Sequence, residues 1–251
     1  MAGISACFCS AQDAERFEGL EVALLSTVDD SAKVRLLLEL ADRLDNTEPE
    51  KALAYTLQGL SLCERHHWDA QLAEFQLEVI FLYRRPLVNY PKAIAQAQAL
   101  METSHTLHSD RYRAEALAEF GIIFKEMNDF SKAIEHLDSS LRICRRIHYA
   151  AGVGDCLRFL AHSHLSLNDT TAARTCFEQN VKEMLAYGDS TQLCNAIIDL
   201  AGFHLSRSGP ETALTHLSRA IRIAQLRSRP ETITSHGEVG RVQFHAIEAM
   251  I

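Results

Sequence analysis

Asp155, Arg158 and His162 are the residues whose types and spacing could do chemistry at one place. They follow one another at steps of three and four, which puts them on one face of a helix. A guanidinium binds carboxylates through two parallel hydrogen bonds, so Arg158 beside His162 could hold a carboxylate or an acidic segment. The alternative is a surface ion pair between Asp155 and Arg158, which has little energetic value. The sequence leaves both interpretations open.

Metal and catalytic sites are not indicated, although the chain has 12 His and seven Cys. No HExxH motif occurs, and no set of Cys and His has the spacing of a zinc site. Cys7 and Cys9 form a lone CxC, which is a weak metal signal without further ligands. The GxG at 152–154 is not preceded by a strand, so it does not fit a dinucleotide-binding loop. No nucleophile motif such as GxSxG is present, and we predict no catalytic residue, no cofactor, no metal and no enzymatic activity.

A helical hairpin is predicted over residues 111–147. Apolar residues recur there at steps of three or four on both sides of a short polar turn, as on the apolar stripe of a helix. They are Leu117, Phe120, Gly121, Phe124 and Met127 before the turn, and Ala133, Ile134, Leu137, Leu141 and Cys144 after it. The turn is Asn128-Asp129, two residues that tolerate turn geometry. Gly121 and Ala133 are small where the helices would cross, and a single hairpin needs neighbours like itself to bury both apolar faces.

The hairpin repeats along the chain with a period of 40 or 41 residues. Its clearest marker is a small residue of the second helix, found as Ala52, Ala93, Ala133, Ala173 and Ala213. The turn recurs as Asn168-Asp169 and then as Ser208-Gly209. His164 and His204 fall on the position of Phe124, so we predict that they are packing residues. Five helix-turn-helix units sharing one period indicate a solenoid.

Several residues predict where individual helices begin and end. The stretch Thr47-Glu48-Pro49-Glu50 predicts a helix start with Thr47 as the N-cap, Pro49 in the first turn and Glu50 at the capping-box position. Pro86 ends one helix and Pro91 opens the next. Gly188 reads as a helix stop.

These positions resemble the tetratricopeptide-repeat family. That family has a small residue in its first helix, an aromatic residue three later and an Ala twelve later, matched here by Gly121, Phe124 and Ala133. Phe177 and Ala220 fill further family positions, and the resemblance covers residues 31–228. The family's usual period is about 34 residues, so the units of this chain are longer. The resemblance implies an all-α, right-handed α-solenoid superhelix of about five helical hairpins with end helices.

The resemblance also implies a concave groove lined by the first helix of each unit. Inward-facing positions lie six and three residues before the small residue, and one and four after it. The predicted partner-binding residues are Glu115, Ile122, Lys125, Asp155, Arg158, His162, Asn195 and Ile198, and the same positions hold Ala118, Leu165, Gly202 and Leu205.

Three regions are expected. Residues 1–30 are an N-terminal tail and capping helix, residues 31–228 the five-repeat array, and residues 229–251 a C-terminal helix. That last helix reads as a sixth first helix or as a connector to an output domain, because the chain stops inside a helical pattern. We therefore expect either the N-terminal part of a longer protein or a last helix that packs unusually. This helix could also mediate a homodimer.

The composition limits the partners and the cellular location that we expect for the protein. The net charge is −8 and the pI about 5.8, which argues against a nucleic-acid or anionic-membrane partner. No stretch approaches the roughly 20 apolar residues of a membrane span, and the N-terminus does not read as a secretory signal. Most Cys fall on helix stripes and look like core thiols, so a cytoplasmic location is expected.

The expected function is a non-catalytic interaction or regulatory module that binds a peptide or protein partner in its groove. Arrays with units of about 40 residues are similar to N-terminal input regions of bacterial signalling proteins, which commonly carry a GGDEF diguanylate cyclase, a histidine kinase or a DNA-binding domain. Alternatives are a small-molecule or peptide-pheromone receptor that compacts on ligand binding, and a stand-alone assembly scaffold.

Overall fold

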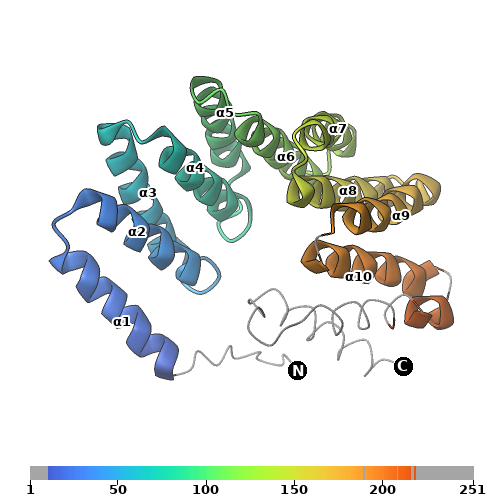
Figure 1. Cartoon of the computed structure of the whole chain (residues 1–251), viewed down its shortest axis with the longest axis horizontal. Helices are drawn as coiled ribbons and strands as arrows, with labels where there is room; N and C mark the ends of the chain where they lie inside the picture. Colours follow the sequence, from blue (N-terminus) through green and yellow to red (C-terminus); the bar gives the residue numbers. More distant parts are fainter. Residues whose placement is uncertain (1–10, 189, 208, 216–217, 219–251) are drawn as a thin grey trace. The chain divides into compact units, whose positions relative to one another are not determined.

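The computed structural model describes residues 11–188, 190–207, 209–215 and 218, and this part is helical with short turns and no strand (Figure 1). The helices are α1 Ala11–Ser26, α2 Asp30–Leu44, α3 Pro49–His66, α4 Asp69–Arg84, α5 Tyr90–Thr106, α6 Asp110–Glu126, α7 Phe130–Arg146, α8 Ala150–Ser166, α9 Thr170–Tyr187 and α10 Ser190–Arg207. Helix resumes over 210–215. The predicted C-terminal helix at 229–251 and the family position Ala220 lie outside the described residues.

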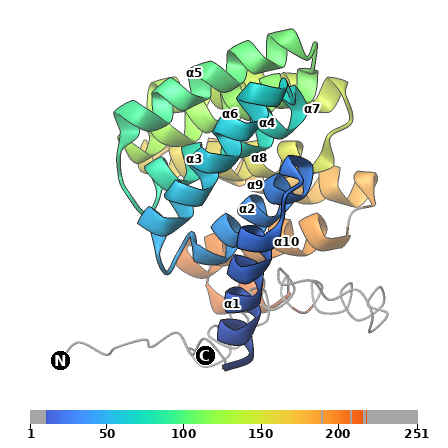
Figure 2. The same cartoon turned by 90° about the vertical axis from the view of Figure 1, so that its left-hand side faces the viewer.

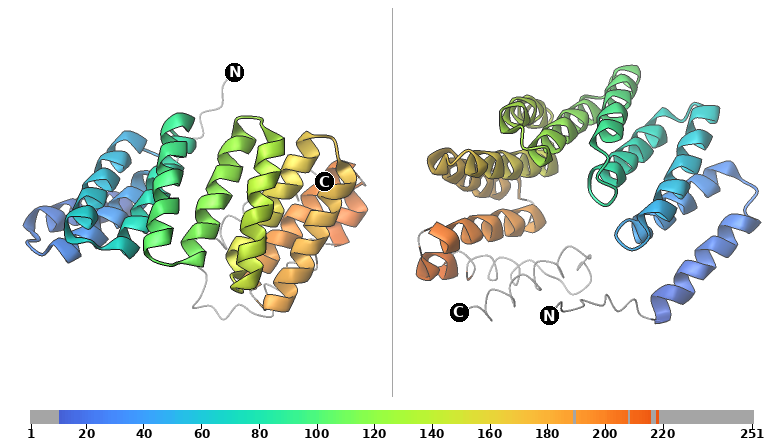
Figure 3. Two further views of the ribbon diagram at one scale, coloured as in Figure 1. Left: turned by 90° about the horizontal axis from the view of Figure 1, so that it is seen from above. Right: turned by 180° about the vertical axis from the view of Figure 1, so that it is seen from behind.

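The chain divides into two units, Met1–Tyr112 (unit 1) and Arg113–Ile251 (unit 2). In unit 1, α2 packs on α3, α3 on α4 and α4 on α5, and α2 also touches α4 (Figure 2). In unit 2, helices α7 to α10 pack in the same consecutive order, and α8 also touches α10 (Figure 3). We call α2, α4, α6, α8 and α10 the A helices and α3, α5, α7 and α9 the B helices. The predicted all-α solenoid of helical hairpins is confirmed.

The helices end in a recurring left-handed turn. Residues with positive φ stand at 88, 108, 128, 148, 168 and 188, one every twenty positions, and His67 and Gly209 continue the series with steps of 21. After five of these helices, the residue following the left-handed one donates its N–H to the carbonyl five residues earlier, for example Asp129 to Phe124 at 2.8 Å. This is the Schellman pattern, which satisfies carbonyls that a helix end leaves open. The period of forty therefore contains two nearly equal helix-and-turn segments.

Acidic and amide side chains start several of the helices. Asp129 accepts the backbone N–H of Lys132 at 3.2 Å, and Asp169 accepts that of Ala172 at 2.9 Å. The predicted Asn-Asp turns are thus an Asn in the left-handed region followed by an N-cap. The prediction of Thr47 as an N-cap is wrong, because α3 begins at Pro49 and Glu48 takes the cap position without a side-chain bond.

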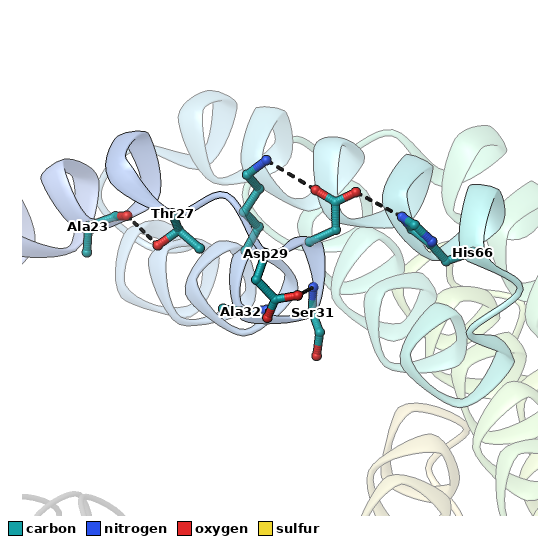
Figure 4. Close-up of polar contacts among 8 residues, drawn as sticks. Ala23, Thr27, Asp29, Ser31, Ala32 and His66 are labelled. Atoms are coloured by element: carbon teal, nitrogen blue, oxygen red, sulfur yellow. Dashed lines mark hydrogen bonds and ion pairs between the residues drawn. The ribbon is translucent and has the colours of Figure 1, made fainter.

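Polar contacts tie the start of α2 to its neighbours (Figure 4). Asp29 caps α2 by accepting the N–H groups of Ser31 and Ala32, at 3.4 and 2.9 Å. The carboxylate of Asp30 lies 2.9 Å from Nε2 of His66, at the end of α3, and 3.1 Å from Nζ of Lys33. The hydrogen bond from His66, followed by that from Lys33, lowers the pKa of Asp30 below its usual value.

Small residues sit where helices approach one another most closely. Ala52, Ala93, Ala133, Ala173 and Ala213 are all buried, as the repeat predicts. A Cβ on Gly121 would lie 2.6 Å from Cγ of Leu137 and 3.0 Å from the carbonyl oxygen of Ala133. This confirms that Gly121 and Ala133 lie at the α6–α7 crossing.

Two buried hydrogen bonds connect the two helices of a hairpin at equivalent positions of unit 2. Ser140 on α7 donates to the carbonyl of Ala114 on α6 at 2.7 Å, and Asn180 on α9 donates to the carbonyl of Gly154 on α8 at 3.2 Å. Each pair is 26 residues apart, and the two pairs are offset by forty. They fix the height of each B helix against its A helix, which sets where the A-helix side chains lie.

Candidate functional site

The candidate site is the face of the A helices α6, α8 and α10 in unit 2, which we call the A-helix surface. Nζ of Lys125, near the end of α6, lies 5.8 Å from the ring centroid of Phe159 on α8. The Arg158 guanidinium lies 4.5 Å from the same centroid. Both distances are within the range of cation–π attraction, so two cations from neighbouring A helices share one aromatic ring.

Arg158 is held by a single carboxylate. One of its Nη atoms lies 2.5 Å from Oδ1 of Asp155, one helical turn away. Both side chains are partly exposed, so this is the ion pair that the sequence left as an alternative to a binding role. Among the described residues this is the only hydrogen bond of the guanidinium, and four of its five N–H donors are left for another acceptor.

His162 stands one turn after Arg158 on the same helix. Its ring meets that of Phe177 edge-on, with centroids 5.6 Å apart. The residue is exposed, yet desolvation by the surrounding protein lowers the pKa of His162, followed by smaller contributions from Lys125 and Arg158. The imidazole is therefore mainly neutral at pH 7.

Asp199 on α10 interacts electrostatically with Arg158 and Asp155 and was not among the predicted residues. Burial raises the pKa of Asp199 to about 6; the charge of Arg158 opposes that rise and the charge of Asp155 adds to it. The sequence signal that could have found it is the register two residues before the small position. That register holds Phe159 in α8 and Asp199 in α10, and the family's four inward positions omit it.

The other predicted site residues are placed differently. Ile122 is only 5% exposed and belongs to the hydrophobic core of unit 2, which corrects its prediction as a groove residue. Glu115 accepts a hydrogen bond from the hydroxyl of Tyr149 at 2.9 Å. Asn195 and Ile198 are half-buried on α10. The structure thus gathers Lys125, Asp155, Arg158 and His162 on α6 and α8.

No group of three or more His, Cys, Asp or Glu side chains in the described ranges could hold a metal ion. Among the described helices, none is both long and apolar enough to cross a bilayer.

Comparison with known proteins identifies the architecture. No protein-family model matches the sequence, and no curated protein matches it. Among solved structures, BtubC (BKLC) of P. vanneervenii matches with a TM-score of 0.62 and 19% identity, covering 90% of this chain and 94% of that one.

Two larger proteins match as well. A Rap protein complexed with competence and sporulation factor has a TM-score of 0.69 and 13% identity, over 94% of this chain and 62% of that one. A STAND protein of Pyrococcus horikoshii with a tetratricopeptide-repeat sensor has a TM-score of 0.61 and 19% identity, over 95% of this chain and 37% of that one. At these identities the likeness concerns the fold, and this chain has the fold of the tetratricopeptide-repeat solenoids.

Proposed function

We propose that this chain is a non-catalytic binding module that holds a peptide or a protein segment on the A-helix surface of unit 2. The observation that carries the proposal is the placement of Lys125 and Arg158, on neighbouring A helices, over the ring of Phe159. A ring with two cations beside it offers an apolar contact and charge-assisted hydrogen bonds in one place. Peptide ligands are held by this combination of an anchor and a few charges.

Arg158 is the residue that exchanges partners in this mechanism. In the free protein it is paired with Asp155 through one partly exposed hydrogen bond, which contributes little to stability. A carboxylate of the ligand can replace Asp155 and use two guanidinium donors at once. The exchange is inexpensive for the fold, so binding energy is not lost in breaking a strong internal contact.

The structural neighbours support a peptide- or signal-binding class. One is a Rap protein complexed with competence and sporulation factor, another carries a tetratricopeptide-repeat sensor, and a third, at a TM-score of 0.50, is described as the quorum sensor NprR. Within this proposal the chain is the sensory part of a cytoplasmic bacterial signalling protein, with a GGDEF domain as one candidate output. Residues 229–251, which lie outside the described part of the chain, would then serve as connector or dimer contact.

The alternative is a peptide-pheromone or small-molecule receptor that compacts around its ligand. Small-angle scattering of the chain with and without a selected peptide separates the two. A module that binds on its surface keeps its radius of gyration, whereas a compacting receptor loses part of it. A stand-alone scaffold would bind a folded protein and no short peptide.

The binding test uses a phage-displayed random peptide library selected on the purified chain. The variant Lys125→Ala/Arg158→Ala is expected to lose affinity for selected peptides by about tenfold or more. Its melting temperature should change by less than about 2 °C, because neither residue is in the core. The matched control is Arg142→Ala/Lys182→Ala, which removes the same charge from exposed positions of the B helices α7 and α9. Equal affinity of parent and Lys125→Ala/Arg158→Ala would refute the proposal.

A further inference from the structure

Two buried cysteines of unit 2 lie against the same hydroxyl group. Cys144 is on α7 and Cys156 on α8, and each is only 1% exposed. Sγ of Cys156 lies 3.3 Å from Oγ of Ser140, and Sγ of Cys144 lies 3.8 Å from the same oxygen. The two thiols therefore meet across the joint between two hairpins, because α7 ends one hairpin and α8 begins the next.

The hydrogen bonds of Ser140 allow the two thiols to be joined at little cost to the fold. The hydroxyl donates its proton to the carbonyl of Ala114 at 2.7 Å. Towards both sulfurs its oxygen is therefore an acceptor, and the S–H groups are the donors. A disulfide carries no S–H, so its formation removes two weak donors and leaves the bond to Ala114 in place. No buried donor loses its acceptor when the thiols are oxidised.

Cys144 is the more reactive thiol of the pair, and a glycine covers it on one side. The hydrogen bond from Cys156 lowers the pKa of Cys144 below its usual value, which favours the thiolate that reacts with oxidants. The sulfur of Cys144 lies against the backbone of Gly152, where an added Cβ would be 2.6 Å away. Gly152 is partly exposed in the first turn of α8. A small hydroperoxide therefore needs only a local opening of that turn to reach the sulfur.

We propose that Cys144 and Cys156 are a redox-active dithiol, which a hydroperoxide converts into a disulfide that locks α7 against α8. The hydroperoxide transfers one oxygen atom to the sulfur of Cys144, which becomes a sulfenic acid, and is itself reduced to water or an alcohol. The sulfur of Cys156 then attacks the sulfenic sulfur, the S–S bond forms, and the hydroxyl leaves with the thiol proton as water. The two thiols lose two electrons in total, and the peroxide takes them up. This inference goes beyond the proposed function and does not depend on it.

The disulfide acts on the joint between two hairpins. A cross-link at this place restricts how α8 moves against α7, because it removes the open arrangements of the joint. Helix α8 also carries Asp155 and Arg158 of the A-helix surface, and Cys156 directly follows Asp155 in the chain. Oxidation therefore holds this part of the A-helix surface in one arrangement, and reduction of the disulfide frees it again.

The test is a peptide map of the folded, purified chain after treatment with hydrogen peroxide, with free thiols alkylated under denaturing conditions. Trypsin cuts after Arg145, between the two cysteines, so the disulfide appears as residues 143–145 joined to residues 147–158. Cys176 is the internal control: it is more exposed than either thiol, but burial raises the pKa of Cys176 to about 11 and keeps it protonated. The linked species should form before Cys176 is oxidised, and dithiothreitol should remove it.

Variants and hydrogen exchange make the result specific. Cys156→Ala should abolish the linked species and leave the sulfenic acid of Cys144 to be trapped by dimedone, whereas Cys176→Ala should leave the linkage unchanged. In the oxidised parent, amides in the first two turns of α8 should exchange about tenfold or more slowly than in the reduced parent. Circular dichroism of each variant verifies that it is folded.

Two results of the peptide map would overturn the inference. One is oxidation of Cys176 while residues 143–145 and 147–158 stay unlinked. The other is a linkage that forms in urea but not in the folded chain, because the folded placement of the thiols would then not promote it. Unchanged exchange of α8 in the linked protein would show that the disulfide does not lock the joint. None of these results touches the proposed function, which Lys125→Ala/Arg158→Ala decides.

Discussion

Glu78, on α4 of unit 1, is a carboxyl group that other carboxyl groups influence. Burial, followed by the charges of Asp45 and Asp42, raises the pKa of Glu78 to about 7. One of its oxygens, Oε1, is enclosed by protein and has no hydrogen-bond partner. Ionising this group in the folded protein is therefore unfavourable relative to the unfolded chain, in which its pKa is near 4.5.

Glu78→Gln is expected to stabilise the protein above neutral pH. The folded-state pKa is raised, so the penalty is absent below about pH 4.5, grows as pH rises and is complete above pH 7. After allowance for solvent screening of a partly exposed group, it amounts to about 1–2 kcal/mol at pH 8. Urea unfolding at pH 5, 6.5 and 8 should show an advantage of the variant that grows with pH. The exposed Glu50→Gln serves as control, and an advantage that is the same at all three pH values would contradict this account.

Ile122, His162 and Gly202 illustrate what the sequence could and could not predict at a single residue. The three occupy one repeat position, and the repeat correctly put them on A helices. Yet Ile122 is buried in the core while His162 and Gly202 are exposed. Spacing fixes the direction in which a side chain leaves its own helix. How deeply that side chain is buried depends on the side chains of the neighbouring helix. For the same reason Asp199 was missed, since its pKa depends on burial and on Arg158 from another helix.

The helices and turns were the most predictable level of this protein. Polar turn residues, Pro at helix starts and the spacing of small residues are local signals, and Pro86, Pro91 and Gly188 mark ends and starts as expected. The N-cap of α3 was misjudged because two preferences competed. Pro49 suits the first helical position, so the residue before it, Glu48, becomes the N-cap. This holds although Thr47 is the better capping residue.

Close packing between helices predicts opposite effects of one substitution at two glycines. A Cβ on Gly59 of α3 would overlap the ring of Phe75 on α4, a ring that is fully buried. Gly59→Ala should therefore destabilise the protein by about 1–3 kcal/mol. A Cβ on Gly202 of α10 meets nothing within 4 Å, so Gly202→Ala should stabilise it by about 0.5–1 kcal/mol through helix propensity. Thermal unfolding of both variants measures this, and equal shifts would show that packing at Gly59 is looser than described.

At the scale of the whole chain, the repeat could be read from the sequence, but the division at Tyr112 could not. The period depends on apolar residues that every hairpin needs. The division depends on how extensively neighbouring hairpins pack against each other. The identity of a ligand could not be predicted either, because no local sequence motif encodes it. The fold class follows from many weak, consistent signals, and the site follows from a few side chains that different helices bring together.

In a solenoid, a destabilised hairpin affects mainly the hairpins next to it, and this gives a prediction for the whole molecule. Each hairpin packs mainly on adjacent ones, so a strained contact between α3 and α4 should lower stability there first. In Gly59→Ala, hydrogen exchange followed by mass spectrometry should show faster exchange in α3 and α4. Amides of α8 and α9 should exchange as in the parent. Uniformly faster exchange along the chain would mean that the molecule unfolds as one cooperative block.

The left-handed residues Asn128 and Asn168 close equivalent turns forty positions apart. A copied stretch of DNA encoding residues 129–168 could be inserted after Asn168 and would meet the same joint on both sides. The protein can thus be lengthened or shortened by tandem duplication or deletion without inventing a new connection. For the proposed binding module, the number of ligand residues that the array can contact becomes a quantity that recombination changes in whole repeats.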